Sequence, residues 1–509
     1  MSRLSLATST ALATVLSASI AQADVTADDV WANVRAYLDT FGGTLTVQPA
    51  RNGNTLSTGE LALEWTLPMN GGTVRMSESS FDMVELGDGT VELVIPEGFQ
   101  LHVAVEPTGK PPFSATINLG VAGMTSIASG DPGKVTYTST VETVTMALAD
   151  LVVPEVENPD ATFTMTMHDV ESTQVVEVGS VVSIDTQTTQ GAYDFAFRMD
   201  DGKGGVMEQS GKATGGTGAF SIVLPRNGMD ILNLAAALRD GLTASLSADM
   251  QGYETSQVMR MNGQVVQDQT STVADYKFGM DLQKSGLTFE GTATEMSMKV
   301  FLPQVIPLEL NLAAANSSGR MALPLSAGDD LQEAALSMDL SGVTVGESLW
   351  GLIDPGKTLP RDPATVRLDL TAQVRSYLDW LDFLTVGAKL DAGEEPGELH
   401  SVTLNDLTVE AAGASLTGTG AATFDNTDKV TFNGLPKPSG TLDMTLKGAN
   451  ALIEKLQGIG LMSEQDAMGA RMGMGMVAKP APEEGEDVLK SHIELTGEGH
   501  VMANGIRLR

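Results

Sequence analysis

The sequence contains no cysteine, which excludes disulfide bonds, thiol catalysis and a lipid anchor attached to cysteine. Aromatic residues form only 5% of the chain, and 4 residues are tryptophan, so the stacked platforms of sugar-binding proteins are not expected. Basic residues are also scarce, at 30 against 65 acidic residues, and the formal charge is -35. A chain this acidic, without a Lys/Arg cluster, repels nucleic acids and anionic lipid head groups. We therefore expect no nucleic-acid partner.

The first 23 residues have the composition of a secretory signal peptide. Arg3 supplies the positive charge, a short apolar stretch rich in Ser and Thr follows, and Ala21-Gln22-Ala23 is a small-x-small cleavage site. The apolar stretch is too short and too rich in hydroxyl groups to span about 30 Å of hydrocarbon. We therefore expect cleavage after Ala23, with retention as an anchor as the alternative. No later run of about eighteen apolar residues predicts a transmembrane helix, so the sequence predicts an exported, periplasmic protein.

Beyond this leader, short runs of alternating apolar and polar residues dominate the sequence. In Thr441–Lys447, the side chains of Leu442, Met444 and Leu446 share one face, and polar side chains share the other. A period of two residues is typical of a strand with one buried face. Turn signals such as Asn52-Gly53 separate the runs. We predict a mainly β fold: an elongated antiparallel meander, curled into a groove or closed as a sandwich, with a few short helices.

A few segments interrupt the strand pattern. The first helix is expected at Thr26–Phe41, capped by Thr26 and stopped by Gly42. Ser376–Phe383 is a short apolar segment whose spacing fits a helix or a strand. Gly473–Asp487 is rich in Met, Pro and acidic residues and is expected to be a mobile loop. Further helices are expected at Asp230–Arg239, Gly346–Asp354, Ala449–Gly458 and Ser463–Met472.

The expected elements divide the mature chain into three regions. An N-terminal β region with a leading helix covers residues 24–225, and a middle β region covers residues 226–345. A C-terminal β region with short helices and the Met/Pro-rich loop covers residues 346–509.

The predicted helices are too few to cover so long a sheet. A buried Leu, Met or Phe contributes about 1.5–3 kcal/mol, but only if something covers it. The sheet must therefore fold back into a closed sandwich or curl into a groove whose apolar lining accepts an acyl chain. Alternation looks the same in both arrangements, so both stay open.

No group of residues has the spacing of a known catalytic or metal site. The 5 histidines lack metal-binding spacing, and no serine lies in a G-x-S-x-G elbow. Asp200-Asp201 and Asp329-Asp330 lie in loops but lack the pattern of a Ca²⁺-binding loop. We therefore expect no enzymatic activity, no cofactor and no bound metal, and an enzyme is only the third hypothesis.

Methionines cluster near the C-terminus, at Met462, Met468, Met472, Met474 and Met476. They have three interpretations: packing residues of an amphipathic helix that runs into a loop, a flexible flap over an apolar groove, or thioether ligands of Cu(I). Packing is preferred, because the other methionines fall mostly on apolar strand faces. The candidate ligand-binding residues are Leu442, Met444, Leu446, Met468, Met472, Met474 and Met476.

Several motifs of the C-terminal region resemble a known family. They include Leu352-Ile353-Asp354-Pro355, Leu359-Pro360-Arg361-Asp362-Pro363 and Leu404-Asn405-Asp406-Leu407. These residues resemble the uncharacterised alphaproteobacterial family catalogued as domain of unknown function 2125, most clearly over residues 346–509. The activity of that family is not established, so the resemblance carries over no functional residues. More distantly, the C-terminal strands are similar to the AsmA-like envelope proteins, and this similarity implies an open sheet groove that handles lipid.

These observations lead to one main hypothesis and one alternative. The main hypothesis is a non-catalytic periplasmic protein that binds or chaperones an apolar ligand, a lipid or an acyl chain, in a β-sheet groove. The alternative is a structural or interaction protein of the cell envelope with a closed β core and a protein partner.

Overall fold

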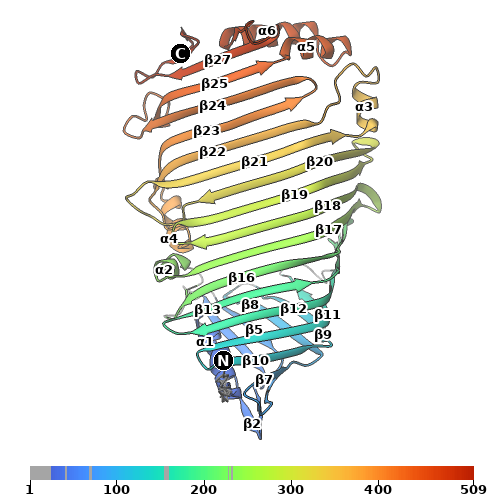
Figure 1. Cartoon of the computed structure of the whole chain (residues 1–509), viewed down its shortest axis with the longest axis vertical. Coiled ribbons are helices and arrows are strands. Elements are labelled where there is room, and N and C mark those ends of the chain that lie inside the picture. The colour runs from blue at the N-terminus through green and yellow to red at the C-terminus, as the bar shows by residue number, and fades with distance from the viewer. Residues whose placement is uncertain are drawn as a thin grey trace, which may run out of the picture.

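The computed structural model of the chain describes residues 24–40, 43–67, 72–109, 111–153, 160–226, 229–230 and 233–509. The predicted leader, residues 1–23, lies outside the described residues, as does Phe41 at the expected end of the first helix. The described residues form six helices and one sheet of 29 strands, which confirms the mainly β fold. Figure 1 shows the strands stacked along the long axis of the molecule, with α5 and α6 at the C-terminal end.

The strands are short at the N-terminal end and long in the middle of the chain. The first are β1 (Thr44–Thr46), β2 (Ala50–Asn52), β3 (Thr55–Ser57), β4 (Leu61–Leu67), β5 (Gly72–Glu78), β6 (Asp82–Glu85), β7 (Val91–Val94), β8 (Gly98–Pro107), β9 (Phe113–Ala122) and β10 (Thr125–Asp131). The next are β11 (Lys134–Val152), β12 (Asp160–Val178), β13 (Val181–Gln190), β14 (Tyr193–Asp200), β15 (Gly205–Ala213), β16 (Gly215–Pro225), β17 (Thr243–Met261), β18 (Gln264–Gln283), β19 (Gly286–Leu302) and β20 (Ile306–Leu323). The last are β21 (Gln332–Val345), β22 (Ala364–Ser376), β23 (Gly397–Ala411), β24 (Ala414–Asp425), β25 (Lys437–Lys447), β26 (Lys479–Pro480), β27 (Val488–Leu495), β28 (Val501–Ala503) and β29 (Ile506–Arg507). The helices are α1 (Ala27–Thr40), α2 (Leu234–Arg239), α3 (Glu347–Ile353), α4 (Phe383–Asp391), α5 (Ala449–Gly458) and α6 (Glu464–Val477).

Two long strands, β11 and β12, hold together a branched N-terminal part. One half of β11 pairs with β10 and the other half with β9, and both pairs are antiparallel. β12 likewise pairs with β13 and β14 along separate halves. The branches meet again at β17, which pairs with both β15 and β16. From β17 to β25 each strand pairs with the next one in the sequence, as a meander does.

Pairing continues across both of the expected region boundaries. β16 pairs with β17 near residue 225, and β21 pairs with β22 near residue 345. The sheet is therefore continuous there, and the division of the chain into three regions stays a prediction.

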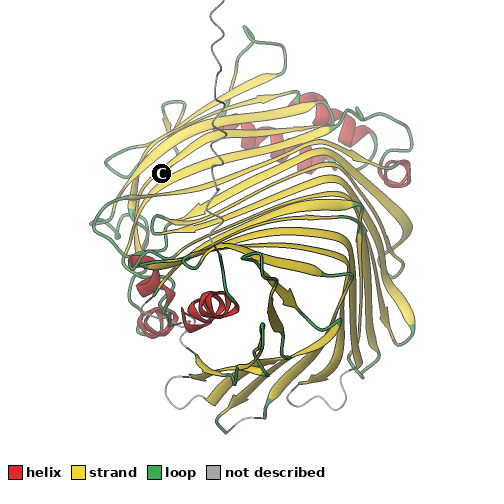
Figure 2. Ribbon diagram, turned by 60° about the horizontal axis from the view of Figure 1, so that its bottom comes forward, coloured by secondary structure: helices red, strands yellow, loops and turns green. Residues whose placement is uncertain are grey.

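The long strands are interrupted along one line across the sheet. Gly252 in β17, Glu295 in β19 and Gly342 in β21 have positive φ angles of 59°, 48° and 68°. Pairing is broken beside these residues and resumes on the far side of them. Irregularities of this kind bend a strand, and Figure 2 shows the strands bending part-way along their length. Aligned irregularities on neighbouring strands thus give the sheet its curl.

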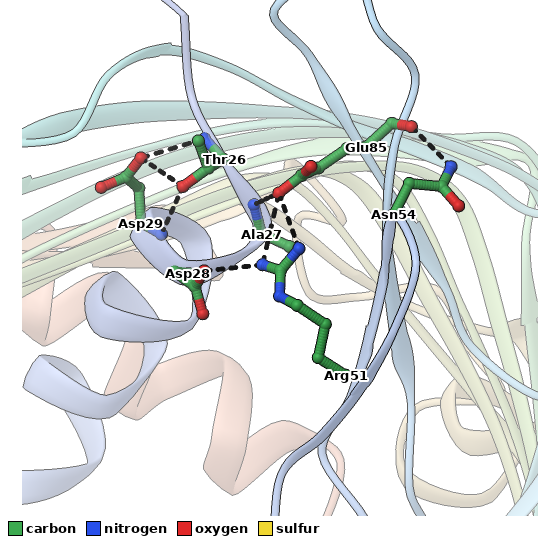
Figure 3. A network of polar contacts seen from close by, with 7 residues as sticks. All are labelled: Thr26, Ala27, Asp28, Asp29, Arg51, Asn54 and Glu85. Atoms are coloured by element: carbon green, nitrogen blue, oxygen red, sulfur yellow. Dashed lines mark hydrogen bonds and ion pairs between the residues drawn. The ribbon is translucent and has the colours of Figure 1, made fainter.

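Helix α1 begins with the expected cap. The N–H of Asp29 donates to Thr26 Oγ1 (3.2 Å), and the N–H of Thr26 donates to Asp29 Oδ2 (3.0 Å), which is a reciprocal capping box. Arg51 of β2 ties this end of the helix to the sheet, because it pairs with Asp28 (2.6 Å) and Glu85 (3.3 Å), as Figure 3 shows. The predicted first helix and its Thr26 cap are therefore confirmed.

Further along α1, Asn33 holds the helix against the long strands. Its side chain is 2% exposed, donates to the carbonyl of Val176 (3.4 Å) and accepts from the hydroxyl of Tyr137 (2.9 Å). Burial raises the pKa of Tyr137, which keeps its hydroxyl protonated as a donor. Val30 and Trp31 of the same helix are buried in the main core of the protein. α1 therefore fills the N-terminal end of the curled sheet.

This core does not extend along the sheet. Its buried members lie between Val25 and Leu242. Within strands β17–β25, all of whose residues are described, Ala293 is the only buried apolar residue. The described residues of β17–β25 thus form an open sheet and not one layer of a closed sandwich.

Two of the later helices agree with the sequence prediction. α3 lies within Gly346–Asp354, and α5 coincides with Ala449–Gly458. α2 begins at Leu234 and not at Asp230, because Asn233 caps it by accepting the N–H of Ala236 (3.2 Å); residues 231–232 lie outside the described residues.

The segment Ser376–Phe383 is neither helix nor strand for most of its length. It leads from the end of β22 into α4, a helix that was not predicted from the sequence. Asp382 caps α4 by accepting the N–H of Thr385 (3.2 Å), so a cap signal was present in the sequence.

We predict that the stability of the bent sheet depends on Gly342. A Cβ added there would lie 2.5 Å from the Cβ of Ala315. We expect Gly342→Ala to cost about 1–2 kcal/mol for the left-handed backbone and about 1–3 kcal/mol for the overlap, measured by urea unfolding. Gly263→Ala is the matched control, because Gly263 also has a positive φ but a Cβ there meets nothing within 4 Å. Equal losses in the two variants would show that the close approach at Gly342 is unimportant.

Candidate functional site

The alternation of neighbouring strands lines up into continuous apolar rows across the sheet. Residues that pair directly lie on the same face, and we call the face that carries these rows the apolar face. The first row is Phe220, Leu246, Met280, Phe289, Met321, Leu336, Leu370, Leu404, Gly420 and Leu442. The second is Ala248, Phe278, Gly291, Gly319, Met338, Leu368, Leu407, Gly418 and Met444. The third includes Leu340, Val366, Val409, Leu416 and Leu446.

Three of the predicted ligand-binding residues belong to these rows. Leu442, Met444 and Leu446 are half-buried, while the neighbouring Thr441 and Asp443 are exposed on the opposite face. Each of the three is the member of its row on β25. The structure thus joins these residues to a surface that begins at β16 and crosses every strand in between.

The apolar face is open along much of its length. Leu336 and Met338 are each 45% exposed, Phe220 is 38% exposed and Leu246 is 37% exposed. Burial of apolar surface contributes about 25 cal/mol per Å² to stability. The exposed part of these side chains does not contribute this free energy in the protein alone. A row of half-exposed Leu, Met and Phe is therefore a surface on which an apolar ligand would gain free energy.

The opposite face, the polar face, carries cross-strand ion pairs. Lys277 pairs with Asp249 (2.7 Å), and their hydrogen bond raises the pKa of Lys277. Arg367 pairs with Asp339 (2.7 Å) and Asp406 (3.4 Å). Exposed pairs of this kind stabilise a fold by only about 0–1 kcal/mol each. These charged side chains make the polar face hydrophilic, so that it stays in contact with solvent.

A pocket of about 520 Å³ opens at the rim of the apolar face, next to α4; we call it the rim pocket. This volume lies in the range of about 300–1,000 Å³ that is usual for small-molecule sites. Trp380 forms one wall: its N–H donates to the carbonyl of Leu325 (2.8 Å) and its Nε1 to Ser376 Oγ (3.1 Å). The apolar lining consists of Leu323, Pro324, Leu325, Ala334, Val374, Trp380, Pro396 and Leu399. This pocket was not predicted from the sequence, although a tryptophan in an ambiguous apolar segment was a usable signal.

Polar groups gather at one side of the rim pocket. Arg375 pairs with Glu398 (3.1 Å), and His400 Nε2 lies 3.0 Å from the same carboxylate. The hydrogen bond from Tyr377, and then those from His400 and Arg375, hold the pKa of Glu398 below its usual value. The pocket therefore combines an apolar lining with a fully paired charged edge.

The predicted methionine residues lie on one helix but on two of its faces. Met468, Met472 and Met476 are 62%, 65% and 62% exposed, whereas Met474 is half-buried beside Ala467, which is fully buried. The three exposed side chains thus lie mostly in solvent.

The prediction of a mobile loop over Gly473–Asp487 is wrong at its start. Gly473–Val477 continues α6, and Lys479–Pro480 pairs with β27 as β26. The carbonyl of Val477 accepts the hydroxyl of Ser491 (2.6 Å), which fixes the end of the helix on β27.

Other residues raised by the sequence have structural partners. Asp201, considered for Ca²⁺, accepts the N–H groups of Lys203 (2.7 Å) and Gly205 (2.8 Å), which lower the pKa of Asp201 and define a turn. His492 lies 2.6 Å from Asp443 on the exposed side of β27. Among the described residues, no three His, Asp or Glu side chains are grouped so that they could hold a metal ion.

The motif around Asp354 builds a turn. Asp354 is fully buried, and its carboxylate accepts the N–H groups of Thr358 (3.0 Å) and Leu359 (2.8 Å). These bonds, the one from Thr358 first, lower the pKa of Asp354. Arg361 donates to the carbonyl of Asp354 (3.1 Å) and stacks on Trp350, 4.9 Å from the ring centre. The motif thus has a structural role between α3 and β22.

The fold and the apolar face define an elongated protein built on one open β-sheet with a closed N-terminal end. The chain belongs to the family described as "Uncharacterized protein conserved in bacteria" (DUF2125), which matches residues 244–508. This confirms the resemblance over residues 346–509 and extends it to the start of β17. No curated protein matches the chain. The similarity to AsmA-like proteins stays a prediction, and none of the described helices is long and apolar enough to cross a membrane.

We predict that Asp354 makes stability depend on pH. Because its pKa is lower in the folded chain than in the unfolded chain, its charge stabilises the fold above a pH of about 4, and this contribution is lost as the pH falls through the folded pKa. Asp354→Asn should lower the melting temperature at pH 7, and the difference from wild type should shrink below about pH 4. The exposed Asp362→Asn is the control and should change neither value. A difference that is the same at every pH would contradict this role.

Proposed function

We propose that the protein binds or chaperones an apolar ligand, a lipid or an acyl chain, on the apolar face without catalysing a reaction. The single observation that carries the proposal is the continuous apolar surface of β16–β25, on which Phe220, Leu246, Leu336 and Met338 are 37–45% exposed. A folded protein rarely leaves so continuous an apolar patch without a partner for it. The proposal requires no cofactor.

The dimensions of the face favour an extended ligand. The first row runs from β16 to β25, so nine strand spacings of about 4.8 Å give it a length of about 43 Å. That exceeds the hydrocarbon thickness of a bilayer, about 30 Å, which two opposed acyl layers fill. One or more acyl chains can therefore lie along the face, and the rim pocket offers a more enclosed place for a chain end.

We also propose that the protein acts in the periplasm, on the basis of the leader sequence. The acidic chain and the paired charges of the polar face favour a role in the aqueous space between membranes rather than adhesion to anionic lipid. A structural or interaction protein of the cell envelope is the second candidate, and the apolar face would then be the site of a protein partner.

Mass spectrometry of an organic extract distinguishes the two candidates. The protein is expressed with its leader, purified from periplasm without detergent and extracted. A reproducible lipid in near-stoichiometric amount is the expected result. Extracts of folded protein that contain no lipid would overturn the proposal in favour of the interaction protein.

We predict that a charge on the apolar face weakens this binding. Met338→Asp puts a carboxylate under the ligand, and its desolvation should weaken binding at least about tenfold, or about 1.4 kcal/mol. Binding is measured with the neutral apolar dye N-phenyl-1-naphthylamine, and circular dichroism verifies the fold. Met444→Asp, at the β25 end of the same row, tests whether the ligand extends to β25. Ser337→Asp, one residue away on the polar face, is the matched control, and an equal loss there would refute the assignment of the face.

The leader sequence predicts a defined N-terminus for the exported protein. In a bacterial host the purified protein should begin at Asp24, as read from its intact mass, because cleavage follows Ala23. Ala23→Arg should block cleavage and leave the leader attached. A full-length mass for the wild-type protein recovered from periplasm would contradict the predicted cleavage.

A further inference from the structure

Three glutamines interrupt the apolar face on the other side of the bend. Gln209 of β15, Gln257 of β17 and Gln269 of β18 are direct cross-strand partners, and we call them the glutamine row. The next residues in the same line are apolar, Phe197 on β14 and Val300 on β19. The row is thus a short polar island in an otherwise apolar line.

Register and one contact place the glutamine row on the apolar face. The line beside it runs through Phe195 on β14 and Met298 on β19. Between those two strands that line carries Gly211, Thr255 and Ser271, so it is polar at the same place. The hydroxyl of Tyr193, two residues before Phe195, donates across the bend to Met250 Sδ (3.2 Å). Met250 lies on the apolar face, two residues from Ala248 of the second row, so both sides of the bend present the same face.

The amides of the row retain hydrogen-bonding capacity. Gln267 Nε2 donates to Gln269 Oε1 (3.1 Å), and Gln269 Nε2 donates to Ser271 Oγ (3.2 Å). Gln257 Nε2 donates to Met207 Sδ (3.7 Å), a weak acceptor. Each primary amide has two N–H donors and a carbonyl, and all of these glutamines are half-buried and reached by solvent. A ligand can therefore exchange water at these groups for direct hydrogen bonds.

The polar island is uncharged. Its members are amides and hydroxyls, whereas the nearby charged residues of the same strands, Glu208 and Arg260, pair with each other on the opposite face. A charged head group placed here would lose water without meeting a counter-charge. An ester or amide carbonyl would accept hydrogen bonds from the N–H groups of the amides, and it carries no charge whose desolvation must be compensated.

We propose that the glutamine row binds the ester or amide carbonyls of an uncharged acylated ligand, whose chains lie on the apolar residues at either side. This inference rests on the proposed function and narrows it from apolar ligands in general to acyl esters and acyl amides. It also gives the ligand a fixed position along the sheet, because a hydrocarbon alone would bind equally well along the whole face.

The test compares two ligands that share a twelve-carbon chain. Glycerol monolaurate carries an uncharged ester, and dodecane carries no polar group; each displaces N-phenyl-1-naphthylamine from the full-length protein. The variant is Gln257→Met with Gln269→Met, which keeps the shape of the side chains and removes both amides. Gln187→Met on the polar face is the matched control.

We expect the double variant to need about tenfold more monolaurate for half displacement, with dodecane unchanged, because two hydrogen bonds to the ligand are lost. The control should behave as wild type with both ligands. Unchanged monolaurate displacement, or an equal shift for both ligands, would overturn the role of the row while leaving the proposed function intact. Failure of the dye to bind the wild-type protein would instead overturn the proposed function and this inference together.

Discussion

Backbone hydrogen bonding between neighbouring strands is the interaction on which the rest of this structure depends. The chain has no cysteine, and the main core of its described residues lies at the N-terminal end, so strands β17–β25 hold together chiefly by pairing with their neighbours. Antiparallel pairing satisfies the N–H and C=O groups of both strands whatever their side chains are. The sheet can therefore leave one face uncovered without leaving backbone groups unpaired. An open apolar face is compatible with a stable fold for this reason.

The sequence predicts well those features that depend only on residues close together in the chain. Leu442, Met444 and Leu446 alternate within one strand, and the structure places them on one half-buried face. Thr26 and Ser463 begin helices because each caps its own first turn. The end of α6 was missed because Gly473 and Gly475 each disfavour a helix by about 1 kcal/mol. Packing at Ala467 and the bond from Ser491 to Val477 outweigh that local preference.

Features that depend on pairing between distant residues were not predictable in the same way. Gln257 and Gln269 read in the sequence as ordinary polar residues of strands, and only the register of a long hairpin with a bend sets them side by side. The rim pocket needs Trp380 to fold back on Leu325, which no local period indicates. Strand register and backbone irregularities decide which side chains share a face. A single sequence carries this information only indirectly.

The residue at which the family match begins coincides with a change in the strand order. The match begins at residue 244, at the start of β17, which is where the branched part ends and the simple meander begins. Such a meander is quasi-one-dimensional, since each strand contacts only its neighbours, and like a solenoid it needs a terminal cap. Here α1 and the branched strands supply that cap at the N-terminal side. The length of the sheet can then change without any change in the cap. Each added or deleted hairpin would change the length of the apolar face by about 10 Å. The number of hairpins therefore sets the length of ligand that the face can accommodate.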